Sequence, residues 1–227
     1  MIKIRRQMLI GIAFVSIAIR ALTACNGHQL NQDSQPLTAT FAWNTLKDGN
    51  KRFVHHHQIH PDVTQQRITE VAQQQHPFAI IVSCSDSRVS PELIFDQGLG
   101  DLFVIRSAGN LLSAIEMGSI EYGVKHLSIP LVIIIGHERC GAIEAFTKHE
   151  VANGYLKSIL DTLNNEPEIK AVVDNSNYVE ACVKANVRHM CHMVVLDTSL
   201  AKRLQSNELK VLGAVYNLES GEVEFLQ

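Results

Sequence analysis

The sequence has few aromatic residues, no excess of basic charge and no apolar run long enough to cross a membrane. Aromatic side chains make up 6% of the 227 residues, so aliphatic residues must fill most of the core. The formal net charge is −3 and no basic stripe is visible, which excludes the electrostatic footprint of a nucleic-acid-binding protein. Internal repeats and low-complexity blocks are also absent. The length suffices for one sizeable core, so a single globular domain is expected.

Two short cysteine motifs are the most informative features that the sequence does contain. The first, CSDSR, occupies residues 84–88, and the second, HERCG, occupies residues 137–141. Each follows a run of apolar, largely β-branched residues, at 78–82 and 131–135. Short apolar runs that end at a polar residue are typical of buried strands in a parallel sheet. Both motifs are therefore expected at the carboxyl ends of strands, where open α/β sheets bind their ligands.

Cys84, His137 and Cys140 are expected to meet at one point if the two strands are neighbours. Two thiolates and an imidazole form a three-residue zinc set, which leaves a fourth position for chemistry. A lone cysteine at a strand end is more often structural, but three zinc-type ligands beside a carboxylate and a guanidinium favour a metal centre. A zinc finger is not expected, because a whole βαβ unit separates the ligands. We therefore predict one zinc ion per chain.

With both motifs in this order, the chain resembles the β-class carbonic anhydrases, whose pattern is Cys-x-Asp-x-Arg followed by His-x-x-Cys. The resemblance runs from about residue 43 to the C-terminus. It includes further short stretches, at residues 95–106, 108–110, 119–122, 213–216 and 220–221. It implies a zinc-dependent, reversible hydration of CO2 to bicarbonate and a proton, in which zinc-bound hydroxide attacks CO2.

The resemblance also implies roles for four further residues. Asp86 and Arg88 are expected to be catalytic, because a carboxylate beside a guanidinium stays ionised and is held by a forked hydrogen bond. While this pair is intact, Asp86 accepts a hydrogen bond from zinc-bound hydroxide; when it breaks, Asp86 can become the fourth zinc ligand and close the site. Gln75 is expected to bind substrate across a dimer interface, and Gly109 to place its backbone beside the substrate. The sequence leaves open which state of the pair predominates.

Two other functions fit parts of this pattern. One is a hydrolase of CS2 or COS on the same scaffold, since zinc hydroxide attacks any linear heterocumulene. The other is a non-catalytic zinc-binding protein of the cell envelope. That second function predicts the loss of Asp86 or Arg88, and both are present. The complete set of residues therefore favours a carbonic anhydrase.

The order of apolar and helical segments predicts an α/β fold. Strands are expected at residues 78–83, 102–105 and 131–135, with a terminal hairpin formed by 210–216 and 222–226. Helices are expected between the strands and over most of residues 155–195. The resemblance implies a central, mostly parallel sheet flanked by helices, with four parallel strands and one antiparallel edge strand. It also implies a homodimer, which can pair further into a tetramer.

The N-terminus predicts export. A basic start is followed by an apolar stretch at residues 8–19, which is too short to span a bilayer but suits the core of a signal peptide. Leu22-Thr23-Ala24-Cys25 resembles a bacterial lipobox, so residues 1–24 are expected to be removed and Cys25 to carry a lipid, although Arg20 is unusual so close to the cysteine. Residues 25–40 then form a polar tether, and residues 41–227 the catalytic domain. This predicts a periplasmic or cell-envelope protein tethered to the membrane; a cytoplasmic protein with an amphipathic N-terminal arm is the alternative.

Two remaining groups of residues are interpreted as structural. The histidines at 55–57 are expected in a solvated loop, with a proton relay or metal scavenging as alternatives. Cys182 and Cys191 fall within one predicted helix, nine residues apart. That spacing is about 13 Å along a helix axis, too far for a disulfide, so both are expected to be core residues.

Overall fold

The structure is a computed structural model, and it describes residues 37–226. The expected signal peptide (1–24), the lipidation site at Cys25 and nearly all of the expected tether (25–40) lie outside the described residues and stay predictions. The first helix begins at Ala39. Among the described residues, no helix is both long and apolar enough to cross a membrane.

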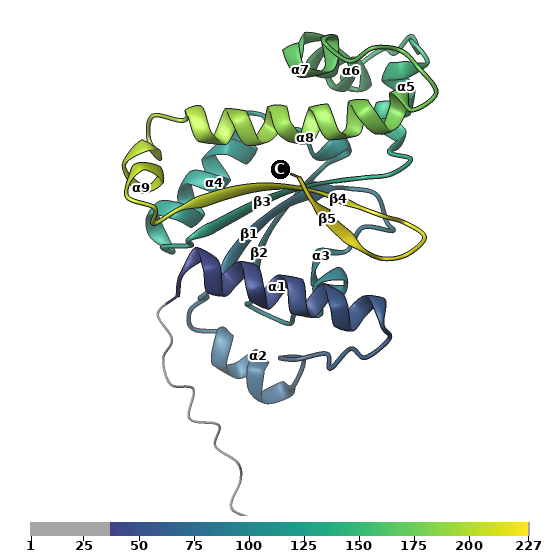
Figure 1. Cartoon of the computed structure of the whole chain (residues 1–227). Helices are drawn as coiled ribbons and strands as arrows, with labels where there is room; N and C mark the ends of the chain where they lie inside the picture. The colour runs from purple at the N-terminus through teal and green to yellow at the C-terminus, as the bar shows by residue number, and fades with distance from the viewer. Residues whose placement is uncertain (1–36, 227) are drawn as a thin grey trace, which may run out of the picture. The chain divides into compact units, whose positions relative to one another are not determined.

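A five-stranded sheet forms the centre of the domain, in the order β2-β1-β3-β4-β5 (Figure 1). Its strands are β1 (Ala79–Cys84), β2 (Leu102–Ser107), β3 (Leu131–His137), β4 (Lys210–Tyr216) and β5 (Val223–Phe225). The first four strands pair in parallel, and β5 runs antiparallel to β4 at one edge. This confirms the predicted α/β fold, with four parallel strands and one antiparallel edge strand.

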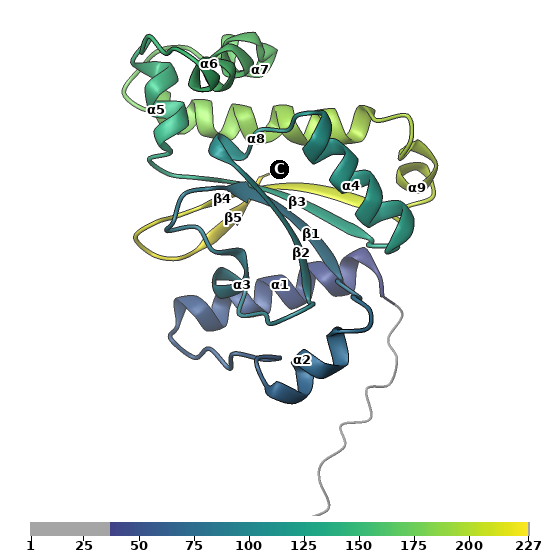
Figure 2. The ribbon, with the colours of Figure 1, turned by 180° about the vertical axis from the view of Figure 1, so that it is seen from behind.

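Helices cover both faces of the sheet. In Figures 1 and 2, α1 and α3 lie on one face, whereas α4 and α8 lie on the other. The helical segments are α1 (Ala39–Val54), α2 (Gln65–Val71), α3 (Pro91–Ile94), the 3-10 turn η1 (Ala108–Asn110), α4 (Ala114–His126), α5 (Gly141–Thr147), α6 (Tyr155–Asn165), α7 (Pro167–Lys170), α8 (Tyr178–Leu196) and α9 (Ala201–Gln205). The expected helical stretch at 155–195 is interrupted, because Pro167 starts a new helix and residues 171–177 form no helix.

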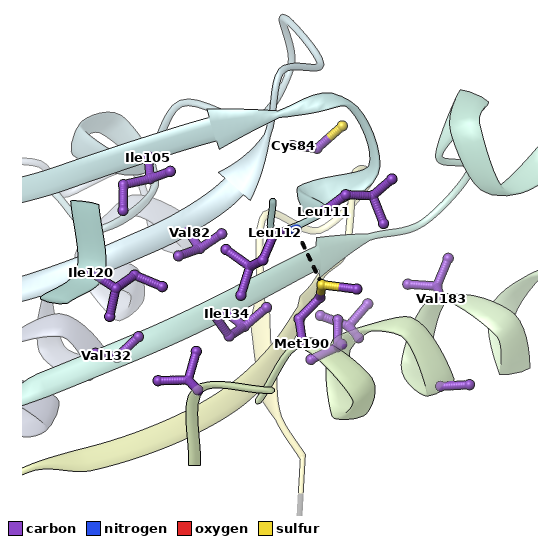
Figure 3. Close-up of a cluster of buried hydrophobic side chains, with 14 of the residues drawn as sticks. Val82, Cys84, Ile105, Leu111, Leu112, Ile120, Val132, Ile134, Val183 and Met190 are labelled. Atoms are coloured by element: carbon purple, nitrogen blue, oxygen red, sulfur yellow. Dashed lines mark hydrogen bonds between the residues drawn. The ribbon is translucent and has the colours of Figure 1, made fainter. Parts of the chain in front are cut away.

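Because helices cover both faces, the two central strands are apolar or buried along their whole length. Alternate residues of β1 and β3 belong to two separate hydrophobic clusters. Ile81 and Ile133 pack with α1 and α3, while the opposite face packs against α4 and α8. Figure 3 shows this second cluster, in which Val82 and Ile134 of the sheet lie across from Met190 of α8.

Two glycines let α8 lie unusually close to the sheet. A Cβ atom at Gly136 of β3 would lie 2.7 Å from a methyl group of Val187, and a Cβ atom at Gly213 of β4 would lie 2.8 Å from its other methyl group. Carbon atoms that are not bonded pack at about 3.5–4.0 Å, so any larger residue at either position would push the helix away. The glycines therefore set the distance between α8 and strands β3 and β4.

One buried side chain joins the start of the domain to its end. Asn50 of α1 donates from Nδ2 to the carbonyl oxygens of Ile94 and Gly221, at 3.1 and 2.8 Å. Its Oδ1 accepts a hydrogen bond from the backbone N–H of Val223 at 3.0 Å. Asn50 is buried, so these three bonds replace water at both ends of the amide. The first helix is thereby fixed to α3 and to the β4–β5 hairpin.

Candidate metal centre

The two cysteine motifs meet because β1 and β3 are adjacent parallel strands. Ile81 pairs with Ile133 and Ser83 with Ile135, so both strands end at the same edge of the sheet. Cys84 is the last residue of β1. The ordering of the strands therefore brings the motif at 84–88 next to the motif at 137–141, as the sequence predicts.

The three predicted zinc ligands lie together at this edge. His137 is the last residue of β3, and Cys140 precedes the first residue of α5. One ligand atom each from Cys84, His137 and Cys140 lies within 4.8 Å of the other two, and all three residues are buried. Among the described residues, no other group of three or more histidine, cysteine, aspartate or glutamate side chains comes this close together.

The imidazole of His137 has the hydrogen bonding expected of a zinc ligand. Its Nδ1 lies 2.8 Å from the carbonyl oxygen of Glu138, which fixes the ring and leaves Nε2 as the free nitrogen. Nε2 is buried and has no hydrogen-bond partner among the described residues. A buried nitrogen without a partner is costly unless it binds something else. Zn²⁺ prefers sulfur and imidazole nitrogen donors, and the second ring nitrogen of a zinc-binding histidine normally makes a hydrogen bond that orients the ring. The residues present therefore fit a zinc ion.

The two thiols are electrostatically coupled. A hydrogen bond from Cys140 lowers the pKa of the Cys84 thiol, against the effect of burial, and His137 lowers it further. The same interaction with Cys84, together with burial, raises the pKa of Cys140. Without a metal, the interaction between the two sulfurs therefore favours a thiolate at Cys84 and opposes a second thiolate at Cys140. Zinc binds thiolates, so binding of the ion must release the second proton.

Asp86 and Arg88 form a forked ion pair at the mouth of the site. Arg88 donates from Nε to Oδ1 at 2.9 Å and from Nη2 to Oδ2 at 2.7 Å, and its backbone N–H also donates to Oδ1. The hydrogen bonds from Arg88 hold the pKa of Asp86 far below its ordinary value. Oδ2 of Asp86 lies 3.9 Å from Nε2 of His137. The carboxylate is therefore ionised and close to the ligands, but it is bonded to Arg88 and is not part of the three-residue cluster.

The structure places the other two predicted site residues differently. The backbone N–H of Gly109 donates to Sγ of Cys84 at 3.3 Å, so Gly109 contacts a predicted zinc ligand. Gln75 lies in the loop between α2 and β1, where it is exposed and makes no hydrogen bond within residues 37–226. Its predicted role depends on a partner subunit and stays a prediction. The histidines at 55–57 follow α1 and are exposed, as expected for a solvated loop. Among the described residues, Cys182 and Cys191 form no disulfide.

Two residues that sequence reasoning did not single out also act on this site. Arg106 of β2 donates to the carbonyl oxygens of Cys84, at 3.1 Å, and Asp86, at 2.7 Å, so it holds the first motif in place. Asn186 of α8 donates from Nδ2 to the carbonyl oxygen of Gly109 at 2.8 Å. Arg106 ends one of the stretches noted above, but Asn186 is a single polar residue in a long helix. No local pattern distinguishes it.

Comparison with known proteins agrees with this geometry. The family model described as carbonic anhydrase matches residues 79–223. A carbonic anhydrase from Mycolicibacterium smegmatis is 35% identical over 81% of this chain and 91% of its own length. The solved structure of the β-carbonic anhydrase CcaA superposes with a TM-score of 0.66 at 26% identity, covering 81% of this chain and 91% of that one. A chain from the crystal structures of two tetrameric β-carbonic anhydrases of the ascomycete Sordaria macrospora shares the fold, with a TM-score of 0.63 at 24% identity; the match covers 82% of this chain and 96% of that one. The chain therefore belongs to the β-class carbonic anhydrases, zinc enzymes that reversibly hydrate CO2 to bicarbonate.

Proposed function

We propose that the chain hydrates CO2 with Cys84, His137 and Cys140 as its zinc ligands, and with Asp86 kept off the metal by Arg88. The observation that carries this proposal is the position of three buried ligand atoms within 4.8 Å of one another, beside an intact Asp86–Arg88 pair. The arrangement corresponds to the open state of the two that the resemblance implies.

Asp86 has the properties of a group that orients the attacking water. Zinc supplies the Lewis acidity that makes water a nucleophile near neutral pH. An ionised carboxylate only accepts hydrogen bonds, and Asp86 is held on Arg88 through both oxygens. It can therefore accept a hydrogen bond from the O–H of a water beside the ligands. A lone pair of the water oxygen then points toward the carbon of CO2. Water and CO2 give bicarbonate and one proton. Because the pKa of Asp86 is so low, the carboxylate does not retain that proton, which passes to solvent.

The alternative functions have no support of their own. The relatives that match the chain are named carbonic anhydrases, and no feature of the described residues favours CS2 or COS as the substrate. A purely structural zinc site would not need a carboxylate held 3.9 Å from the imidazole nitrogen by a forked arginine. Hydration of CO2 therefore accounts for more of the site than either alternative.

Stopped-flow measurement of CO2 hydration tests this function directly. The full-length chain is assayed as purified, after zinc is removed by a chelator, and after zinc is returned, from neutral to alkaline pH. We expect turnover that disappears with the zinc and returns with it. A folded chain that holds one zinc ion and shows no turnover at any pH would contradict the proposal.

We further propose that the chain forms a homodimer, which can pair into a tetramer. The Sordaria macrospora relatives are described as tetrameric. Strand β2 is an edge strand, and no strand of the described residues pairs with its outer side. An open edge with half-buried apolar side chains, as at Leu102, Phe103 and Val104, is a surface that proteins normally cover. Light scattering on the zinc-loaded chain should give a mass of at least two chains; a monomer at micromolar concentration would contradict this and would remove the predicted role of Gln75.

A further inference from the structure

The backbone of Gly109 is hydrogen-bonded to a predicted zinc ligand on one side and to α8 on the other. Its N–H donates to Sγ of Cys84 at 3.3 Å, and its carbonyl oxygen accepts a hydrogen bond from Asn186 at 2.8 Å. Gly109 has a φ of 69°, in the left-handed region that glycine adopts without strain. The same lack of a side chain means that its two peptide groups turn easily, so something else must hold the N–H on the sulfur.

Asn186 is the group that holds it. The residue is 1% exposed and lies on a side of α8 that is otherwise apolar, one turn before Met190. Its Oδ1 is buried and has no hydrogen-bond partner among the described residues. An amide with an unpaired oxygen costs free energy in such surroundings, and an apolar side chain would avoid that cost. Within residues 37–226, the bond to Gly109 is the one hydrogen bond that the amide makes.

The position of α8 explains how the helix can reach the glycine. The methyl groups of Val187 lie over Gly136 and Gly213, where a Cβ atom would approach them to within 2.8 Å or less. This close contact fixes Val187, the residue next to Asn186, on the sheet, over the carboxyl end of β3 and the middle of β4. The amide nitrogen of Asn186 is therefore held beside the carbonyl oxygen of Gly109 by a helix that packs tightly on the sheet, and not by a loop.

We propose that Asn186 is a positioning residue of the zinc centre, which holds the Gly109 N–H on the sulfur of Cys84. An N–H donated to a thiolate draws charge from the sulfur and fixes the direction of its lone pairs, and partners of this kind commonly change metal affinity by 10- to 100-fold. This inference rests on the proposed role of Cys84 as a zinc ligand. It concerns zinc binding, which can be measured whether or not the enzyme turns over.

The test is the substitution Asn186→Leu, which keeps the size of the side chain and removes its donor. Zinc affinity is measured on the full-length chain by competition with a chelator, and the sulfur-to-metal charge-transfer band is recorded after Co²⁺ is substituted for zinc. We expect zinc affinity to fall at least about 10-fold. We also expect the Co²⁺ band to move to longer wavelength, because the sulfur regains the charge that the N–H drew away. If Asn186→Leu does not fold, Asn186→Ala removes the same donor.

Met190→Leu is the matched control. Sδ of Met190 accepts a hydrogen bond from the backbone N–H of Leu112 at 3.2 Å (Figure 3), so this substitution also removes one bond between α8 and the segment after η1. That hydrogen bond does not involve a residue bonded to a predicted zinc ligand. Met190→Leu should therefore keep wild-type zinc affinity and the wild-type Co²⁺ band. Wild-type affinity in Asn186→Leu, or an equal loss in Met190→Leu, would overturn the proposal.

Discussion

Replacing Asp86 by asparagine is expected to lower kcat/KM for CO2 hydration about 100-fold, the size of loss that follows when a reacting group is no longer held in position, while the chain keeps its zinc. The carboxylate is acceptor-only and is held through both oxygens by Arg88. An asparagine of the same shape has one acceptor and one NH2 donor, and this donor faces the donors of the guanidinium. The forked pair of hydrogen bonds with Arg88 is lost, and the amide no longer presents a fixed acceptor to the attacking water.

Glu138→Gln is the control for this substitution. It makes the same change from acid to amide in the second motif, where Oε1 of Glu138 accepts a hydrogen bond from Asn217 at 2.9 Å and is not predicted to be a ligand. Stopped-flow rates and zinc content are measured together for the wild type and both variants. The two variants should hold equal zinc and differ strongly in rate. A rate for Asp86→Asn within threefold of wild type would show that the carboxylate is not needed to orient water.

The second large effect is expected at Glu166, which lies between α6 and α7 and is 1% exposed. Neither of its carboxylate oxygens has a hydrogen-bond partner among the described residues. Burial raises its pKa from 4.5 to about 8, and the charge of Glu168 adds to the shift. Glu168 itself interacts with His189 at 2.6 Å and His192 at 3.3 Å, and the charge of Glu166 also acts on Cys182. The folded domain therefore keeps Glu166 protonated at pH values where the unfolded chain ionises it.

The direction of the pH dependence follows from this difference. Below about pH 4.5 the carboxyl is protonated in both states and makes no pH-dependent contribution to stability. As the pH rises toward about 8, the unfolded chain releases the proton and the folded domain does not, so the free energy of unfolding falls by roughly 1.4 kcal/mol for each pH unit. The total is on the order of 5 kcal/mol, and the loss ends above the folded-state pKa. This is a large part of the stability of a typical domain.

Glu166→Gln should remove this dependence. The glutamine amide has a burial cost of its own, but that cost is the same at every pH, so the slope is the informative quantity. Urea unfolding of the zinc-loaded chain at pH 6, 7, 8 and 9 gives the difference in stability between variant and wild type. We expect the difference to grow in favour of the variant up to about pH 8 and then to level off. The exposed Glu150 supplies the control Glu150→Gln, which should show no such growth; a difference for Glu166→Gln that is constant with pH would contradict the assignment.

Much of the metal centre could be predicted because its ligands follow apolar strands. Each motif marks the end of its own strand, and the carboxyl ends of neighbouring parallel strands must meet. The ends of the strands themselves were less well predicted. β3 was expected to stop at residue 135 but continues through His137, because Gly136 and His137 pair with Val215 and Tyr216 of β4. Pairing partners that lie so far along the chain leave no trace in the local pattern of β3.

Asn186 could not be predicted for a related reason. A single asparagine in a helix is normally a solvent-facing residue, and the direction in which it points depends on how the helix is docked. That docking depends on Gly136 and Gly213, which are small residues in two different strands. The sequence contains all three residues, but only the folded arrangement joins them. Hydrogen bonds that position a metal ligand from an element distant in the sequence are therefore the part of such a site that cannot be predicted from the sequence alone.

The three hydrogen bonds of Asn50 have a consequence for how the chain is made. The asparagine lies near the start of the domain, while two of its partners, Gly221 and Val223, lie 171 and 173 residues further along the chain. Helix α1 therefore cannot complete its attachment until the β4–β5 hairpin has left the ribosome. Until the hairpin has been made the domain cannot finish folding, and the apolar face of α1 remains available to chaperones.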